Sequence, residues 1–141
     1  MTRLYRSQLS KILGGGENIS SSKYHNEKIT YKGETFDSRK EFEYFLILED
    51  RLKRGEIYDL KRQVSFEIQP AFETPKGDKI RAVSYIADFV YKERIRPRKA
   101  DDKIISDEII VHVIDVKGYK TEIYKLKKKL LAYKGIYIEE V

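Results

Sequence analysis

The sequence predicts an α/β fold made of a single domain, in which a mixed central sheet is flanked by helices. Apolar residues recur at helical spacing in two segments, after Ser38 and over residues 122–134. Three segments rich in β-forming residues lie between them, and an apolar segment at 136–141 follows the second helix. The resulting order, αβββαβ, ends in a strand–helix–strand crossover, which requires a parallel pair of strands.

The first helix has clear start and stop signals. Residues 28–36 predict a short hairpin that turns at Lys32-Gly33. Ser38-x-x-Glu41 then has the form of a capping box, and Gly55 is the expected stop. The apolar positions of this helix recur at helical spacing and are Phe42, Phe45, Leu46, Leu48 and Leu52.

The strands follow from alternation and from turn residues. Val64, Phe66 and Ile68 alternate with polar residues, and Pro75-Lys76-Gly77-Asp78 predicts a turn. Residues 79–91 and 108–117 predict two further strands, the second of which is apolar on both faces and therefore central. The polar segment between them, 93–107, is predicted as a loop or hairpin tip. In the second helix, the apolar side is predicted as Ile123, Leu126, Leu130 and Tyr133.

Residues 1–27 are predicted to form a flexible or partly helical N-terminal extension, and residues 28–141 the folded domain. Three consecutive glycines and three consecutive serines occur in the extension, and such residues do not repay the entropy of ordering.

The composition of the chain excludes several classes of function. The chain has no cysteine, which excludes disulfide scaffolds, thiolate zinc sites and cysteine nucleophiles. No apolar run reaches the roughly 20 residues of a membrane span, and the expected location is cytoplasmic. There are 29 Lys and Arg against 23 Asp and Glu, a net charge of +6, which favours a polyanionic partner but equally suits a solvated basic surface.

Two strands carry charged residues among apolar ones. Asp115 and Lys117 share a face with Val113, and Asp88 shares one with Ile86 and Val90. A carboxylate in such surroundings needs a partner or an ion.

The first helix supplies a third acid of this kind. At about 100° per residue, Glu41 lines up with the apolar stripe, whereas Glu43 faces the other side. Carboxylates are the hard oxygen ligands that suit Mg²⁺ or Mn²⁺. Glu41, Asp88 and Asp115 are therefore predicted metal ligands, with Lys117 beside them. The alternative is an internal salt bridge between Lys117 and Asp115.

The ordered pattern of helix Glu, strand Asp and strand Asp-x-Lys resembles the PD-(D/E)XK nuclease superfamily. Within it, the chain is similar to a family of small phage proteins, DUF1064, over roughly residues 24–141. The matching stretches are FDSRKEFEYF, LKRQVSFEIQPAF, RAVSYIADFVY, VIDVKG and TEIYKLKKKLLAY. Ala87 stands where the superfamily's proline would be, and the 93–107 segment is longer than the usual hairpin.

The resemblance implies a restriction-endonuclease-like core and a function to match. The expected activity is Mg²⁺-dependent (or Mn²⁺-dependent) endonuclease hydrolysis of DNA, phage-encoded, acting in the host cytoplasm on branched or recombining DNA as Holliday junction resolvases do. Its catalytic residues would be Glu41, Asp88, Asp115 and Lys117. The implied partner is DNA rather than a membrane, and a homodimer is left open. The alternative is a nuclease-fold module that binds DNA or a partner with little or no catalysis.

Basic residues near the predicted site are candidate phosphate contacts. They are Lys120, Lys125, Lys128, Arg94 and Arg96. For each of them, a solvated surface charge is the competing interpretation.

Overall fold

The computed structural model describes residues 28–95, 108–116 and 118–141. The chain divides into two compact units, Met1–Asp50 and Arg51–Val141. Each unit is described by itself. The predicted N-terminal extension lies outside the described residues.

The first unit contains a hairpin and most of a helix. Strands β1 (Ile29–Tyr31) and β2 (Glu34–Phe36) pair antiparallel. Lys32 and Gly33 join them, both with positive φ (50° and 81°), as the tight turn of a two-residue hairpin requires. The Phe36 and Phe42 rings lie 5.2 Å apart between centroids, and both residues are fully buried. The hairpin therefore packs on the apolar side of helix α2 (Arg39–Lys53).

Helix α2 begins and ends where the sequence predicts. The Phe42 amide donates to the Ser38 carbonyl (3.1 Å), which opens the helix. At the other end, the Glu56 amide donates to the Arg51 carbonyl (3.0 Å) across Gly55, whose φ is 70°. This left-handed glycine closes the last turn in the way expected of a helix C-terminus.

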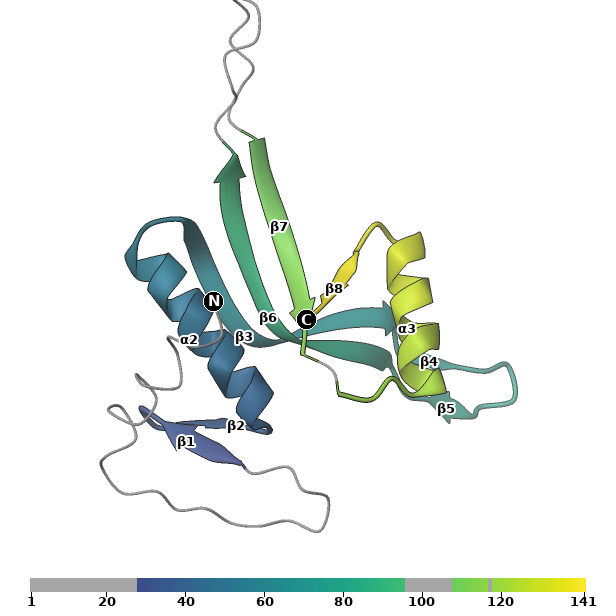
Figure 1. Ribbon diagram of the computed structural model, residues 1–141. Helices are drawn as coiled ribbons and strands as arrows, with labels where there is room; N and C mark the ends of the chain where they lie inside the picture. The colour runs from purple at the N-terminus through teal and green to yellow at the C-terminus, as the bar shows by residue number, and fades with distance from the viewer. Residues whose placement is uncertain (1–27, 96–107, 117) are drawn as a thin grey trace, which may run out of the picture. The chain divides into compact units, whose positions relative to one another are not determined.

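The second unit is built on a four-stranded mixed sheet with the order β3-β6-β7-β8 (Figure 1). Its first three strands are antiparallel neighbours, whereas β7 and β8 are parallel. Helix α3 (Glu122–Tyr133) connects that parallel pair, which confirms the predicted crossover. The strands are β3 (Ile57–Gln69), β6 (Val83–Ile95), β7 (Glu108–Asp115) and β8 (Ile138–Glu140).

Strand lengths differ from the sequence prediction in two places. Strand β3 begins at Ile57, well before the alternation that predicted it. Strand β6 continues through Ile95, into the start of the segment predicted as a loop, because Glu93 and Arg94 still pair with β7. Residues 96–107 lie outside the described part of the chain. The predicted turn at Pro75–Asp78 joins two short strands, β4 (Phe72–Glu73) and β5 (Lys79–Ile80).

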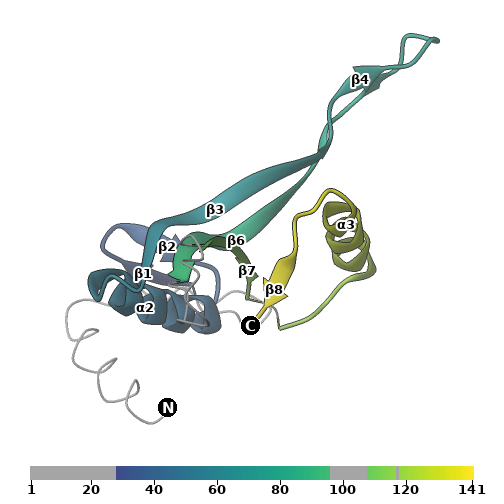
Figure 2. The same cartoon turned by 90° about the horizontal axis from the view of Figure 1, so that it is seen from above.

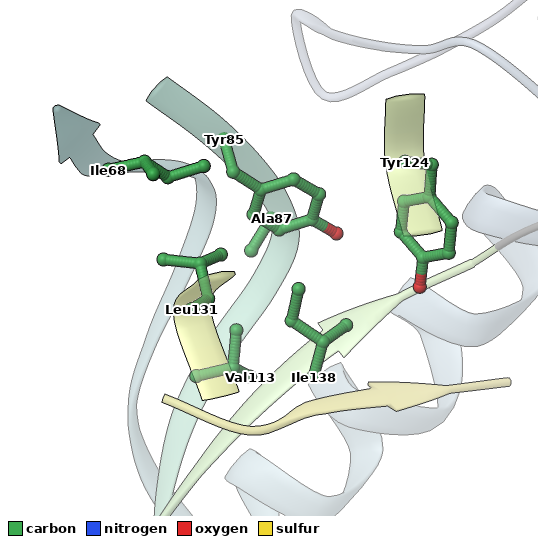
Figure 3. Close-up of a cluster of buried hydrophobic side chains, with 7 residues drawn as sticks. All are labelled: Ile68, Tyr85, Ala87, Val113, Tyr124, Leu131 and Ile138. Atoms are coloured by element: carbon green, nitrogen blue, oxygen red, sulfur yellow. The ribbon is translucent and has the colours of Figure 1, made fainter. Parts of the chain in front are cut away.

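A hydrophobic cluster joins α3 to the sheet (Figure 3). Burial of side chains of this kind stabilises a fold by about 1.5–3 kcal/mol each. The cluster draws on β3, β6, β7, α3 and β8 and consists of Ile68, Tyr85, Ala87, Val113, Tyr124, Leu131 and Ile138.

The buried side of α3 is not the predicted one. Tyr124 and Leu131 are buried, whereas the predicted apolar side, Ile123, Leu126, Leu130 and Tyr133, is exposed. Polar contacts explain this orientation. Lys127 Nζ donates to the Ser84 carbonyl (2.8 Å), and Lys134 Nζ donates to the Ile68 carbonyl. The lysine stems thus lie along the sheet and bring their ammonium groups to its backbone.

None of the helices in the described part of the chain is both long and apolar enough to cross a bilayer.

Candidate active site on strands β6 and β7

Asp88 and Asp115 lie on neighbouring strands, just beyond the last paired residues. Val90 pairs with Val113 and Phe89 with Ile114, and Asp88 and Asp115 are the next residues of the two strands beyond this last pair. The two acids come from separate segments of the chain, and the sheet register brings them together.

Asp115 is fully buried, as its place on a central strand predicts. The Tyr85 hydroxyl donates a hydrogen bond to Asp115 Oδ2. Burial, and then this hydrogen bond, raise the pKa of Tyr85 far above its ordinary value. The phenol therefore keeps its proton and remains a donor to the carboxylate.

Tyr124 of α3 adds a second phenol near the same acid. Burial raises its pKa first, followed by its hydrogen bond to Glu140 and by the charge of Asp115. Its hydroxyl donates to Glu140 Oε1 at 3.0 Å. Asp115 is thus linked to both β6 and α3.

Asp88 is held by the end of the neighbouring strand. The Val116 amide donates to Asp88 Oδ2 at 2.8 Å, and Gln63 Nε2 donates to Asp88 Oδ1 at 3.4 Å. Charge-assisted bonds from backbone amides are among the stronger ones. Val116 directly precedes Lys117, the predicted catalytic lysine, which lies outside the described residues.

The surroundings of Asp88 differ from the sequence prediction. Its expected apolar neighbour Ile86 is exposed, and Asp88 itself is half-buried. The buried side chains of β6 are those on the opposite face: Tyr85, Ala87, Phe89 and Tyr91. The aromatic residues supply more apolar area than Ile86 and Val90, so that face is buried instead. Asp88 therefore sits on the more open side of its strand.

Gln63 has an unusual backbone for a strand residue. Its φ is 50°, while its neighbours Arg62 and Val64 keep regular pairing with Phe89 and Ala87. A left-handed conformation costs a non-glycine residue about 1–2 kcal/mol. The irregularity falls opposite Asp88, where the Gln63 side chain reaches the carboxylate.

Glu41, the third predicted acid, belongs to the first unit. It is buried as predicted. Its amide donates to Ser38 Oγ (3.1 Å), which caps the helix, and its carboxylate Oε2 accepts a hydrogen bond from the Asp37 amide (3.2 Å). The predicted capping box is therefore present, with Asp37 rather than Ser38 as the backbone donor. That Glu41 shares one site with Asp88 and Asp115 stays a prediction.

By itself, the described part of the second unit holds few groupings of potential metal ligands. Among its described residues, no three His, Asp or Glu side chains are grouped so as to hold one ion. Asp88 and Asp115, which the Val116 amide links at the end of β7, are its main candidates for ligand chemistry.

The predicted phosphate contacts on and beside α3 are ion-paired. Lys125 Nζ lies 2.7 Å from Glu122 Oε1, and Lys128 Nζ lies 2.6 Å from Glu140 Oε1. Lys120 also pairs with Glu140. These two lysines, Lys120 first, hold the pKa of Glu140 down to about 2. Arg94 is exposed near the end of β6, and Arg96 lies outside the described residues.

His112 lies on the other face of β7, as the alternation predicts. Its Nδ1 lies 2.7 Å from Glu139 and its Nε2 lies 3.0 Å from Glu93. The imidazole thus bridges β6, β7 and β8 on the face away from Asp115. This arrangement gives His112 a structural role.

Sequence reasoning missed Tyr85, Gln63, Tyr124 and Glu140 as parts of the site. Tyr85 precedes Asp88 by three positions in a segment whose β-forming residues predict only a strand, and no local pattern marks the left-handed backbone of Gln63. These roles depend on contacts across strands, which a single segment does not display.

The fold defines a mixed α/β protein with two acids, Asp88 and Asp115, just beyond the paired residues of neighbouring strands of its sheet. The chain belongs to the family described as "Protein of unknown function (DUF1064)", which matches residues 21–140. Neither the curated proteins nor the solved structures contain a match.

Proposed function

We propose that this protein is a metal-dependent endodeoxyribonuclease of the PD-(D/E)XK type. The observation that supports it best is that Asp88 lies against the end of β7, where the Val116 amide, next to Asp115, donates to Asp88 Oδ2 at 2.8 Å. Two carboxylates held close together repel one another unless a cation or protein donors stand between them. The proposed substrate is DNA, branched or recombining, and the proposed ion is Mg²⁺ or Mn²⁺.

The donor set suits such an ion. Asp88 and Asp115 would hold it, with Glu41 as the proposed third ligand. Mg²⁺ in proteins takes a few carboxylates and keeps several waters, so two acids on one side suffice for a partial shell. When bound, the ion would polarise a phosphate and lower the pKa of a bound water.

The chain's own residues would orient these ligands in advance. Tyr85 holds Asp115 from β6, while the Val116 amide and Gln63 hold Asp88. Ligands fixed by outer hydrogen bonds lose less freedom when they bind an ion. Lys117 follows Val116 in the sequence, and its proposed role is to orient the attacking water or offset charge on the phosphorane.

A second candidate function has an observation in its favour. All three acids already accept hydrogen bonds from the protein: Glu41 from Asp37, Asp88 from Val116, and Asp115 from Tyr85. Such bonds also suit acids whose only role is structural. The second candidate is therefore a nuclease-fold module that binds DNA without cutting it.

A panel of DNA structures separates the two candidates. Linear, nicked, flapped and four-way DNA would be incubated with Mg²⁺ or Mn²⁺ and the wild-type protein. The control is a variant with alanine at Glu41, Asp88, Asp115 and Lys117. Cutting by the wild type alone supports the nuclease. Equal, salt-dependent binding by both proteins with no cutting of any substrate would favour the binding module.

A further inference from the structure

Strands β3 and β6 continue as a two-stranded ribbon beyond the rest of the sheet. Strand β7 pairs with β6 only from Phe89 to Ile95, whereas β3 pairs with β6 as far as Val83. Beyond Val83, β4 and β5 extend the same hairpin. Figure 2 shows this ribbon leading away from β7 and β8 within the second unit.

The tip of the ribbon has a defined shape. The Thr74 amide donates to the Asp78 carbonyl (2.9 Å), and the Gly77 amide donates to the Thr74 carbonyl (2.8 Å). The Asp78 amide donates to Thr74 Oγ1 (3.1 Å), and that hydroxyl donates to Asp78 Oδ2 (3.4 Å). Gly77 takes the left-handed conformation the turn needs, with φ of 86°. The turn is thus closed by its own residues.

The ribbon carries cations that differ from those of α3. Lys76, Lys79 and Arg81 are exposed and, within the part of the chain that the structure describes, form no ion pair. Lys125 and Lys128 on α3, by contrast, are paired with acids. A cation that forms no ion pair does not have to break one when it binds a phosphate.

The ribbon also exposes apolar side chains where no core requires them. Phe72 and Ile80 face one another across β4 and β5 and are 50% and 38% exposed. A two-stranded hairpin by itself is only marginally stable. Apolar side chains at its tip are therefore better explained by contact with a partner than by folding alone.

We propose that the outer part of the ribbon, residues 70–83, docks in a groove of duplex DNA. The inference rests on the proposed function only in taking DNA as the partner. The major groove admits a two-stranded β-ribbon. Lys76, Lys79 and Arg81 would contact phosphates, and Phe72 with Ile80 would meet the sugars and base edges inside the groove. Residues 70–83 hold these three cations against two acids, Glu73 and Asp78, and the excess of positive charge, on side chains that form no ion pair within the described residues, favours a polyanion as the partner.

The test is duplex binding in EDTA, so that cleavage plays no part. Fluorescence anisotropy with a labelled duplex is measured over a range of salt for the wild type and for Lys76→Ala/Lys79→Ala/Arg81→Ala. The ribbon variant should bind roughly 10–100-fold more weakly at low salt, and its slope of log affinity against log salt should fall by about 2–3.

A matched triple variant removes the same charge elsewhere. Arg54→Ala/Lys61→Ala/Lys92→Ala deletes cations paired with Glu56 or Asp59, and its salt slope should stay near that of the wild type. Phe72→Ala should weaken binding severalfold without changing the slope. Circular dichroism melts check that every variant is folded.

Three results would overturn the ribbon proposal. The first is an unchanged slope of log affinity against log salt in the ribbon variant. The second is an equal loss of duplex affinity in the matched triple variant. The third is wild-type binding that is absent, or that is no tighter to duplex than to single-stranded DNA. Cleavage of the DNA panel is measured separately, so a failed ribbon leaves the nuclease proposal standing or falling by its own assay.

Discussion

At the scale of single residues, Tyr85 is the contact on which the buried acid of the site depends. Its hydroxyl donates to Asp115 Oδ2, and Asp115 has no exposed surface of its own. When a buried carboxylate loses a hydrogen-bond donor, its desolvation is no longer offset by that bond, and the fold is destabilised. The role proposed for Tyr85 is positioning, since it acts through Asp115.

The variant Tyr85→Phe tests that role. Unfolding in urea should show a loss of about 1–3 kcal/mol, because the carboxylate keeps its burial and loses its donor. DNA cleavage at saturating Mg²⁺ should fall about tenfold, a barrier increase of about 1.4 kcal/mol. Tyr137→Phe, at an exposed position, is the control and should leave both measurements unchanged. Wild-type stability in Tyr85→Phe would contradict the assignment.

Glu140 makes stability depend on pH in a defined window. Lys120 and Lys128 lower its pKa from the ordinary 4.5 to about 2. A carboxyl whose folded pKa is depressed stabilises the fold above its unfolded pKa, and that contribution is lost as pH falls toward the folded value. Glu140→Gln should therefore be less stable than the wild type near neutral pH.

The same difference should shrink as pH falls through the interval between 4.5 and about 2. Urea unfolding at several pH values in this range measures it. Glu122→Gln, in an exposed pair on α3, should show little difference at any of them. A Glu140→Gln deficit that stays constant down to the lower limit would refute the ion-pair explanation.

At the scale of elements, Glu41 at the start of α2 has two roles to separate, helix capping and the proposed metal binding. Glu41 belongs to a capping box, and it is also the proposed third metal ligand. Capping and metal binding use different properties of the side chain. A cap needs only an oxygen acceptor, whereas a metal ligand needs the negative charge.

Two substitutions separate these roles. Ser38→Ala removes the acceptor for the Glu41 amide and should cost about 1 kcal/mol of stability, with cleavage retained in the folded protein. Glu41→Gln keeps an acceptor for the Asp37 amide, so its stability should change little while cleavage is lost. Urea unfolding and a plasmid cleavage assay are run on both. If Glu41→Gln cleaves as the wild type does, Glu41 is a cap and nothing more.

The sequence predicts helix ends and turns correctly where the signal consists of a few adjacent residues. The Lys32-Gly33 turn, the cap at Ser38 and the Gly55 stop each depend on a few adjacent residues, and all three are found. The side of α3 that packs on the sheet was predicted wrongly. Its orientation depends on Lys127 and Lys134 reaching carbonyls of β6 and β3, which helical spacing cannot reveal.

At the scale of the whole molecule, the candidate site was predictable in part. Alternation along β7 predicted a buried Asp115, and the pairing of β6 with β7 brings Asp88 to the end of the same strand, where the Val116 amide binds it. The partners of these acids were not predictable, because Tyr85, Gln63 and Val116 meet them across strands. Sequence patterns identify residues that are out of place on a face, whereas the register decides which of them meet.

The central claim is that Asp88 and Asp115 support metal-dependent hydrolysis of DNA. Its most direct test is nicking of supercoiled plasmid by the wild type and by Asp115→Asn, in Mg²⁺ and in EDTA, with the exposed acid variant Asp50→Asn as the matched control. We expect wild type and Asp50→Asn to nick only in Mg²⁺, and Asp115→Asn to be at least about a hundredfold slower, a barrier difference of about 2.7 kcal/mol. Nicking by Asp115→Asn at the wild-type rate, or a folded wild type that nicks no DNA with any divalent ion, would contradict the claim.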